Sequence, residues 1–139
     1  MLLVSFTAML SAREFQLWSY QDLLDKSDLV VIATPTTSGD TKEQINLPTV
    51  GPVIGRETVF RISAVLKGDR TLKNLVFHHY REVDTGPKKN SPALVAFDPT
   101  QKSEYLLFLV READGRYAPT TGQSDPGNFD VHAIGRNYE

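Results

Sequence analysis

The chain has 139 residues, of which 15 are basic and 17 acidic, and its formal net charge is −2. This length suits one domain, which can bury a core without a covalent staple. The chain has no cysteine, which excludes disulfides and thiolate sites. The near balance of charges lacks the basic surface that attracts nucleic acids or anionic membranes, so we expect no nucleic acid partner.

The first twelve residues, MLLVSFTAMLSA, are mostly apolar and end in small side chains. They resemble the end of a signal peptide, although no basic residue precedes them. About ten apolar residues are too few to span a bilayer as a helix, so we expect no transmembrane segment. We expect residues 1–12 to be a truncated signal peptide, or else an N-terminal segment packed on the core, and residues 13–139 to be a single domain. The first case predicts a secreted or periplasmic protein and the second a cytoplasmic one.

The next part of the chain predicts a short helix followed by a strand. Ser19 can cap a helix over residues 20–26, and Asp22 three positions later completes a capping box. Residues 29–34 form an apolar, β-branched run that is typical of a buried strand. Residues 36–55 are rich in Thr, Gly and Pro, and a stretch of this length is either a functional loop or a long, bent hairpin.

Alternating apolar and polar side chains predict two further strands, at residues 57–67 and 74–83. In the first of these strands one face is expected to carry the apolar residues Phe60, Ile62, Ala64 and Leu66. Residues 84–92 are expected to form a polar loop.

The last third of the chain predicts three more strands. Residues 104–111 are apolar on both faces, which indicates a central strand. Short strands are expected at residues 93–97 and 117–120, the latter at a sheet edge because it contains Pro119. Residues 122–134 are expected to form a loop with one helical turn. The whole pattern predicts a mainly β fold, a five- to six-stranded OB-like barrel with one short N-terminal helix, although a sandwich shares these signals.

Three segments resemble a known group of proteins when they are taken in order: SDLVVIA at residues 27–33, FRISAVLKG at 60–68 and EYLLFL at 104–109. They are similar to small bacterial exported proteins of unknown function that are related to netrin-like and metalloproteinase-inhibitor (TIMP-like) domains, which are OB barrels. The closing GQSDP at residues 122–126 looks like the end of these exported proteins. The resemblance implies an exported binding or inhibitory module. Animal inhibitors of this group chelate zinc through an N-terminal cysteine, which this chain lacks, so no inhibitory residue is transferred.

The candidate binding residues are consecutive: His78, His79, Tyr80 and Arg81. Neighbouring residues of a strand point to opposite faces, so the two histidines cannot bind one metal ion from a regular strand. One of them could join His132 or Asp130 in a zinc or copper site, but the simpler interpretation is a half-buried, hydrogen-bonded histidine. We therefore expect no catalytic residue, no metal and no cofactor.

The sequence is compatible with three functions. We expect a non-catalytic binding module that recognises a protein partner through loops at residues 36–56 and 84–92, because loops carry binding residues more often than strands do. The alternative is a small metal-dependent hydrolase that uses a strand histidine with nearby carboxylates such as Glu82 and Asp84. A purely structural subunit is the third. No nucleophile elbow and no phosphate-binding loop occurs in the sequence, which favours the binding module.

Overall fold

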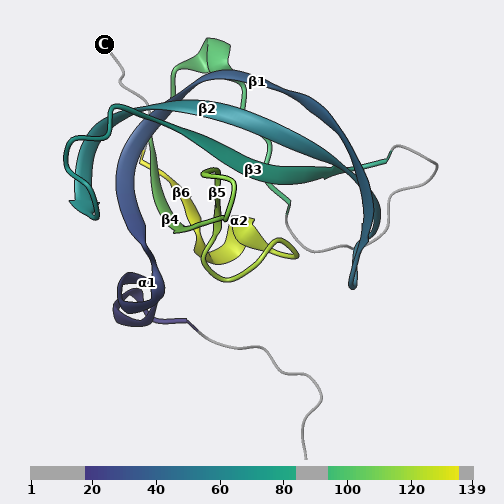
Figure 1. Ribbon diagram of the computed structural model, residues 1–139, viewed down its shortest axis with the longest axis horizontal. Coiled ribbons are helices and arrows are strands. Elements are labelled where there is room, and N and C mark those ends of the chain that lie inside the picture. The colour runs from purple at the N-terminus through teal and green to yellow at the C-terminus, as the bar shows by residue number, and fades with distance from the viewer. Residues whose placement is uncertain (1–17, 84–93, 135–139) are drawn as a thin grey trace, which may run out of the picture.

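The computed structural model describes residues 18–83 and 94–134 (Figure 1), and the expected signal segment lies outside these ranges. It confirms a mainly β class with six strands in one sheet over the described residues. The elements follow one another in this order: α1 (Tyr20–Lys26), β1 (Leu29–Leu47), β2 (Gly51–Lys67), β3 (Asn74–Glu82), the 3-10 helix η2 (Pro99–Gln101), β4 (Tyr105–Arg111), β5 (Tyr117–Pro119), α2 (Pro126–Phe129) and β6 (Val131–Ala133). Neither α-helix in the described ranges has the length and apolarity needed to cross a membrane.

The sheet closes on itself as a ring, which Figure 1 shows as strands wrapped around the centre of the molecule. Its strand order is β1-β2-β3-β5-β4-β6, and β1 pairs with β4 as well. β1 is antiparallel to both β2 and β4, and β4 is antiparallel to β5. The β3–β5 contact is parallel and consists of a single residue pair, Phe77 with Tyr117. Among the described residues the ring therefore has five strands, with β6 beside β4.

The core fills the inside of this ring and is largely aromatic. The rings of Phe60, Phe77 and Phe97 meet edge to face, with centroids 5.0 to 6.0 Å apart. Such pairs add about 0.5–1.5 kcal/mol each beyond the burial of their surface. Aliphatic side chains from β1 and β4 complete the core: Leu29, Val31, Ala33, Leu107 and Leu109.

Helix α1 packs against the outside of the ring, as its apolar face predicts. Leu23 is its buried residue and contacts Val30 and Phe108 in a second, smaller cluster. The predicted capping box is present, because the Asp22 backbone N–H donates to Ser19 Oγ at 3.0 Å and the Asp22 carboxylate accepts from the Ser19 N–H.

Strand β2 keeps the predicted alternation only in part, because two bulges interrupt it. The pairing with β1 skips Ser63 and Leu66. Each extra residue reverses the face on which the following side chains lie. Val65 therefore packs on the core together with Phe60 and Ile62, whereas Leu66 is 51% exposed. The expectation that Leu66 shares a face with Phe60 is wrong for this reason.

Residues 36–55 form a long, bent hairpin and not a loop, since β1 runs to Leu47 and β2 starts at Gly51. The two strands extend beyond the ring to a turn at the right of Figure 1. Threonine favours strands, which explains this outcome for a Thr-rich segment. Pro35 is tolerated because β1 has lost its second partner, β4, after Ala33 and so forms an edge. The prediction of a recognition loop over residues 36–56 is therefore corrected, and we term these residues the arm.

The remaining elements differ from the predictions in three places. Residues 94–97 form no strand, and Phe97 enters the core from an irregular segment. Strand β5 does not lie at an edge, because it stands between β3 and β4, although Pro119 itself pairs only with β4. The C-terminal helical turn is confirmed as α2, whereas the three-residue strand β6 was not predicted. The loop expected at residues 84–92 lies outside the described residues.

Candidate functional site

The two neighbouring histidines of β3 point to opposite faces, as the alternation along a strand predicts. His79 is fully buried on the inner face, where it stacks on Phe77 at 5.2 Å between ring centroids. His78 lies on the outer face beside Tyr80, with ring centroids 4.9 Å apart. Although it is on the outside of the ring, the His78 side chain is only 5% exposed, because other side chains cover it.

A carboxylate lies against each ring nitrogen of His78. Its Nε2 is 2.8 Å from Glu43 Oε1 on the arm, and its Nδ1 is 3.0 Å from both oxygens of Glu112, just after β4. A neutral imidazole has one N–H and can donate to one carboxylate, whereas an imidazolium donates to both. His78 therefore bridges two parts of the fold that are far apart in sequence.

Glu43 has a second partner in Tyr80, whose hydroxyl donates to Glu43 Oε2 at 2.7 Å. Burial alone would raise the pKa of Glu43, but the hydrogen bonds from Tyr80 and His78 outweigh it and lower the pKa below its ordinary value. Burial, aided by the same bond to Glu43, raises the pKa of Tyr80. Glu43 is thus held as an anion and Tyr80 as a neutral hydrogen-bond donor.

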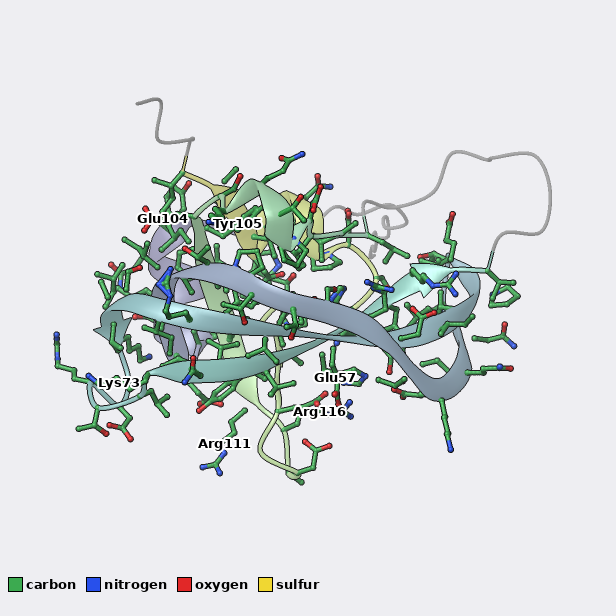
Figure 2. The ribbon with its side chains drawn as sticks, turned by 90° about the horizontal axis from the view of Figure 1, so that it is seen from above. Glu57, Lys73, Glu104, Tyr105, Arg111 and Arg116 are labelled. Carbon is green, nitrogen blue, oxygen red and sulfur yellow. The ribbon has the colours of Figure 1, made fainter. Side chains whose placement is uncertain are left out.

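On the other side of His78 the charges continue through Arg116. Its Nε lies 3.5 Å from Glu112 Oε1 and 2.9 Å from Asp114 Oδ2, and its Nη1 lies 3.1 Å from Glu57 Oε2. Figure 2 shows Glu57 and Arg116 next to each other. The pKa of Arg116 is raised because these carboxylates outweigh its partial desolvation, Asp114 contributing most. The cluster therefore runs without a break from the arm to the β4–β5 turn, and Arg116 is its basic end.

Glu43 reaches His78 across β2 because of one glycine. The pairing of β1 with β2 is interrupted between Asp40 and Gln44, which lets β1 bend over its neighbour. A Cβ atom at Gly55 would lie 2.7 Å from Glu43 Oε1 and 2.6 Å from Thr41 Oγ1. Only a residue without a side chain leaves room for Glu43 in this position.

Arg81, the last of the predicted binding residues, holds the arm from another point. Its Nε and Nη2 donate to the two oxygens of Asp40 at 3.0 and 2.8 Å, and Arg56 also pairs with Asp40. The hydrogen bonds from Arg81 and then Arg56 lower the pKa of Asp40 to about 2. Asp40 therefore joins β1, β2 and β3 as a permanently charged group.

His79 belongs to the core and not to this outer cluster. Its Nε2 lies 2.7 Å from Thr58 Oγ1, which in turn lies 2.7 Å from Ser38 Oγ. Burial lowers the pKa of His79 to about 4, and the charge of Arg56 acts in the same direction. The nearby backbone of Val95 acts to raise the pKa of His79, but this effect is the smaller one. In the described part of the chain His79 Nδ1 makes no well-oriented hydrogen bond. His79 is therefore neutral at physiological pH.

The structure does not bring together the metal ligands that the sequence left open. His132 Nε2 lies 2.6 Å from the Phe129 carbonyl, and the buried Asp130 accepts hydrogen bonds from Thr121. Burial raises the pKa of Asp130 to about 6. Within residues 18–83 and 94–134, no three His, Asp or Glu side chains are arranged to hold a metal ion. At His78 itself the two carboxylates lie on opposite ring nitrogens and do not converge on one point.

Sequence reasoning does not identify the residues around His78, namely its partners Glu43 and Glu112, Arg116 beside Glu112, and the permissive Gly55. They come from three segments, β1, β2 and the β4–β5 turn, and no spacing in the sequence connects one segment with another. Comparisons with protein-family models, with curated proteins and with solved structures find no match to this chain. The interpretation of the cluster therefore depends on its geometry alone.

Proposed function

We propose that this protein is a non-catalytic binding module that recognises a protein partner through the arm and that acts as a secreted or periplasmic protein. The observation that carries the proposal is the fixed orientation of the arm. Glu43 contacts His78 and Tyr80, and Asp40 contacts Arg81, so the third strand supports both. A preorganised element loses less conformational entropy when a partner binds, which increases affinity.

The exposed side chains near the end of the arm supply the contact surface. Ile45 is 39% exposed, and Lys42, Gln44 and Asn46 beside it are exposed as well. An apolar side chain surrounded by polar ones is the usual composition of a protein-binding patch. The loop at residues 84–92 follows β3, which runs beside the arm, and we include it in the proposed surface.

Recognition by added strands is not the mode that we propose. Beyond Ala33 the outer edge of β1 has no strand partner among the described residues. This edge carries Pro35, the charged Asp40 and Lys42, and interruptions of its pairing with β2. Natural sheets use prolines, charges and bulges to prevent another strand from pairing. We therefore expect the partner to contact the side chains of the arm.

As the finer fold assignment we propose the OB-like barrel. The five-stranded ring and its narrow β3–β5 closure support it, because OB folds are five-stranded, partly open barrels. The kinship with netrin-like and TIMP-like domains is part of the same proposal. We do not propose the cysteine-based inhibition that is known in that group.

The same contacts favour a metal-dependent hydrolase less than they favour a binding module. Such a hydrolase requires a histidine nitrogen that is free to bind a metal, yet both nitrogens of His78 face carboxylates and His79 lies in the core. Stoichiometric zinc in the purified protein, lost on His78→Ala, would reverse this preference.

Photo-crosslinking in the source organism tests the proposed function. A photoreactive residue is placed at Ile45 or, as a matched control, at Leu66, which is exposed near the other end of β2. We expect a discrete protein adduct from position 45 and not from position 66. Equal labelling from both positions, or no adduct from position 45, contradicts the proposal. Fractionation of the same cells tests export, which a purely cytoplasmic signal would contradict.

A further inference from the structure

A groove of about 460 Å³ lies beside β3, away from the arm. Its lining is mainly apolar and includes Leu72, Leu75, Val76 and Tyr117, with Asp69 and Arg111 as charged members. Ligand sites are commonly pockets of about 300–1,000 Å³ with apolar walls and a few polar groups. The groove therefore has the size and composition of a ligand site.

The groove lies where the ring of strands is left open. β3 meets β5 only at the pair Phe77–Tyr117, so the preceding residues 74–76 have a strand partner on the β2 side alone. We term this gap the seam, which is closed at Phe77 and open toward the turn that precedes β3. An unpaired strand edge presents N–H and C=O groups with which an extended peptide can form hydrogen bonds.

Arg111 marks the closed end of the seam. It is paired with Tyr117, and Tyr117 is paired with Phe77. Its side chain lines the groove, extends away from the ribbon in Figure 2, and forms no ion pair with a carboxylate of the described residues. A guanidinium binds a carboxylate through two parallel hydrogen bonds, so Arg111 offers a site for an anionic group.

Asp69 marks the opposite, open end, because it lies in the turn before β3. Its Oδ1 accepts hydrogen bonds from the backbone N–H and the hydroxyl of Thr71 at 2.9 and 2.6 Å. The carboxylate is therefore fixed in position as an anion and disfavours a second negative charge at the entrance. The groove is thus positive where the seam closes and negative where it opens.

We propose that this groove binds the C-terminal end of an extended peptide chain, with the terminal carboxylate on Arg111 and apolar side chains against Leu72 and Leu75. A chain that enters from the open end must stop at Phe77, which suits a chain terminus and not an internal segment. Its carboxylate then lies at the end toward which β3 runs, so the bound peptide is parallel to β3. This surface is separate from the arm, and either proposal can fail without the other.

The experiment uses the peptide acetyl-Val-Leu-Val with a free carboxylate and the same peptide with a C-terminal amide. Both are titrated into the ¹⁵N-labelled full chain, and amide shifts are followed by NMR. We expect the free acid to shift the signals of residues 74–76 and Gly115 and to bind at least tenfold more tightly than the amide. Equal affinity of the two peptides, or shifts confined to other residues, overturns the proposal.

Two variants and one further probe sharpen the test. Arg111→Gln should weaken the acid at least tenfold and leave the amide unchanged. Lys73→Gln, which removes an exposed cation that does not line the groove, should alter neither. Octanoate has a carboxylate and an apolar chain but no peptide groups, and we expect it to bind at least tenfold more weakly than the acid peptide. Octanoate binding as tight as that of the peptide overturns the peptide assignment.

Discussion

Glu43 on the arm and His78 on β3 meet with Oε1 and Nε2 2.8 Å apart, although 35 positions separate them in the sequence. The contact passes over β2, the strand between them, and continues through His78 to Glu112. It therefore fastens the arm to the ring at a point beyond the β1–β4 pairing.

Replacing His78 with leucine should destabilise the protein by about 2–4 kcal/mol, because two half-buried carboxylates lose their shared partner. Urea unfolding at pH 7 measures the change. His132→Leu is the control, since that histidine has one backbone partner, and about 1 kcal/mol is expected there. A loss below about 0.5 kcal/mol for His78→Leu would show that the bridge contributes little.

Gly55→Ala should destabilise the protein by about 1–3 kcal/mol, because the new methyl group overlaps Glu43 and Thr41. Gly39→Ala on the same arm is the matched control, since a Cβ there has no atom within 4 Å. Urea midpoints of the two variants give the comparison. Similar midpoints for both would mean that Glu43 moves aside without loss.

Two buried groups, His79 and Asp130, should change the stability of the protein in opposite directions as the pH falls. His79 has a folded pKa of about 4 against an ordinary 6.5, so the unfolded chain takes up the proton first and stability falls as the pH drops through this window. Asp130 has a folded pKa of about 6 against 3.8, so the folded chain takes up the proton first and stability rises over nearly the same window. Each effect amounts to about 3 kcal/mol, so in the wild type the two largely cancel.

Asp130→Asn removes one of these two effects and exposes the other. Relative to the wild type, the variant should lose about 3 kcal/mol of stability as the pH falls from 7 to 4. Chemical unfolding at several pH values measures the difference, in which the contributions of all other groups cancel. A constant difference across this range would contradict the assignment for Asp130.

Asp40→Asn should loosen the arm with little effect on the rest of the fold, because Asp40 is exposed and pairs with Arg56 and Arg81. We expect faster amide hydrogen exchange over residues 40–46 and an unchanged melting temperature. High salt should produce the same change in the wild type by screening these charges. If hydrogen exchange is unchanged in both the variant and the wild type at high salt, then backbone pairing, and not the charge of Asp40, keeps the arm rigid.

The sequence predicts those parts of the fold that depend on local pattern. The capping box at Ser19, the buried strand after Asp28 and the opposite faces of His78 and His79 all follow from spacing within a few residues. The bulges at Ser63 and Leu66 do not, because their position depends on the register of β2 against β1. The same limit applies to the arm, where Thr, Gly and Pro are compatible with both a loop and a long, bent hairpin until the strand pairing is known.

The cluster around His78 was even less accessible from the sequence. Its members lie on β1, β2, β3 and the β4–β5 turn, and they meet only because the ring closes. The residue type of His78 makes it a candidate, but nothing near it in the sequence indicates that Glu43 or Glu112 is its partner. Gly55 gives no local signal either, because its role depends on the side chain that passes over it.

Strand β1 belongs to both the ring and the arm, and this continuity has a mechanical consequence. Residues 29–33 pair with β4 in the wall, and the same strand continues to Leu47 with a bend between Asp40 and Gln44. Tension that is applied along β1 at the tip of the arm therefore loads the β1–β4 hydrogen bonds simultaneously in shear. It does not break them one after another. A partner that pulls on the arm meets the resistance of the wall as a whole.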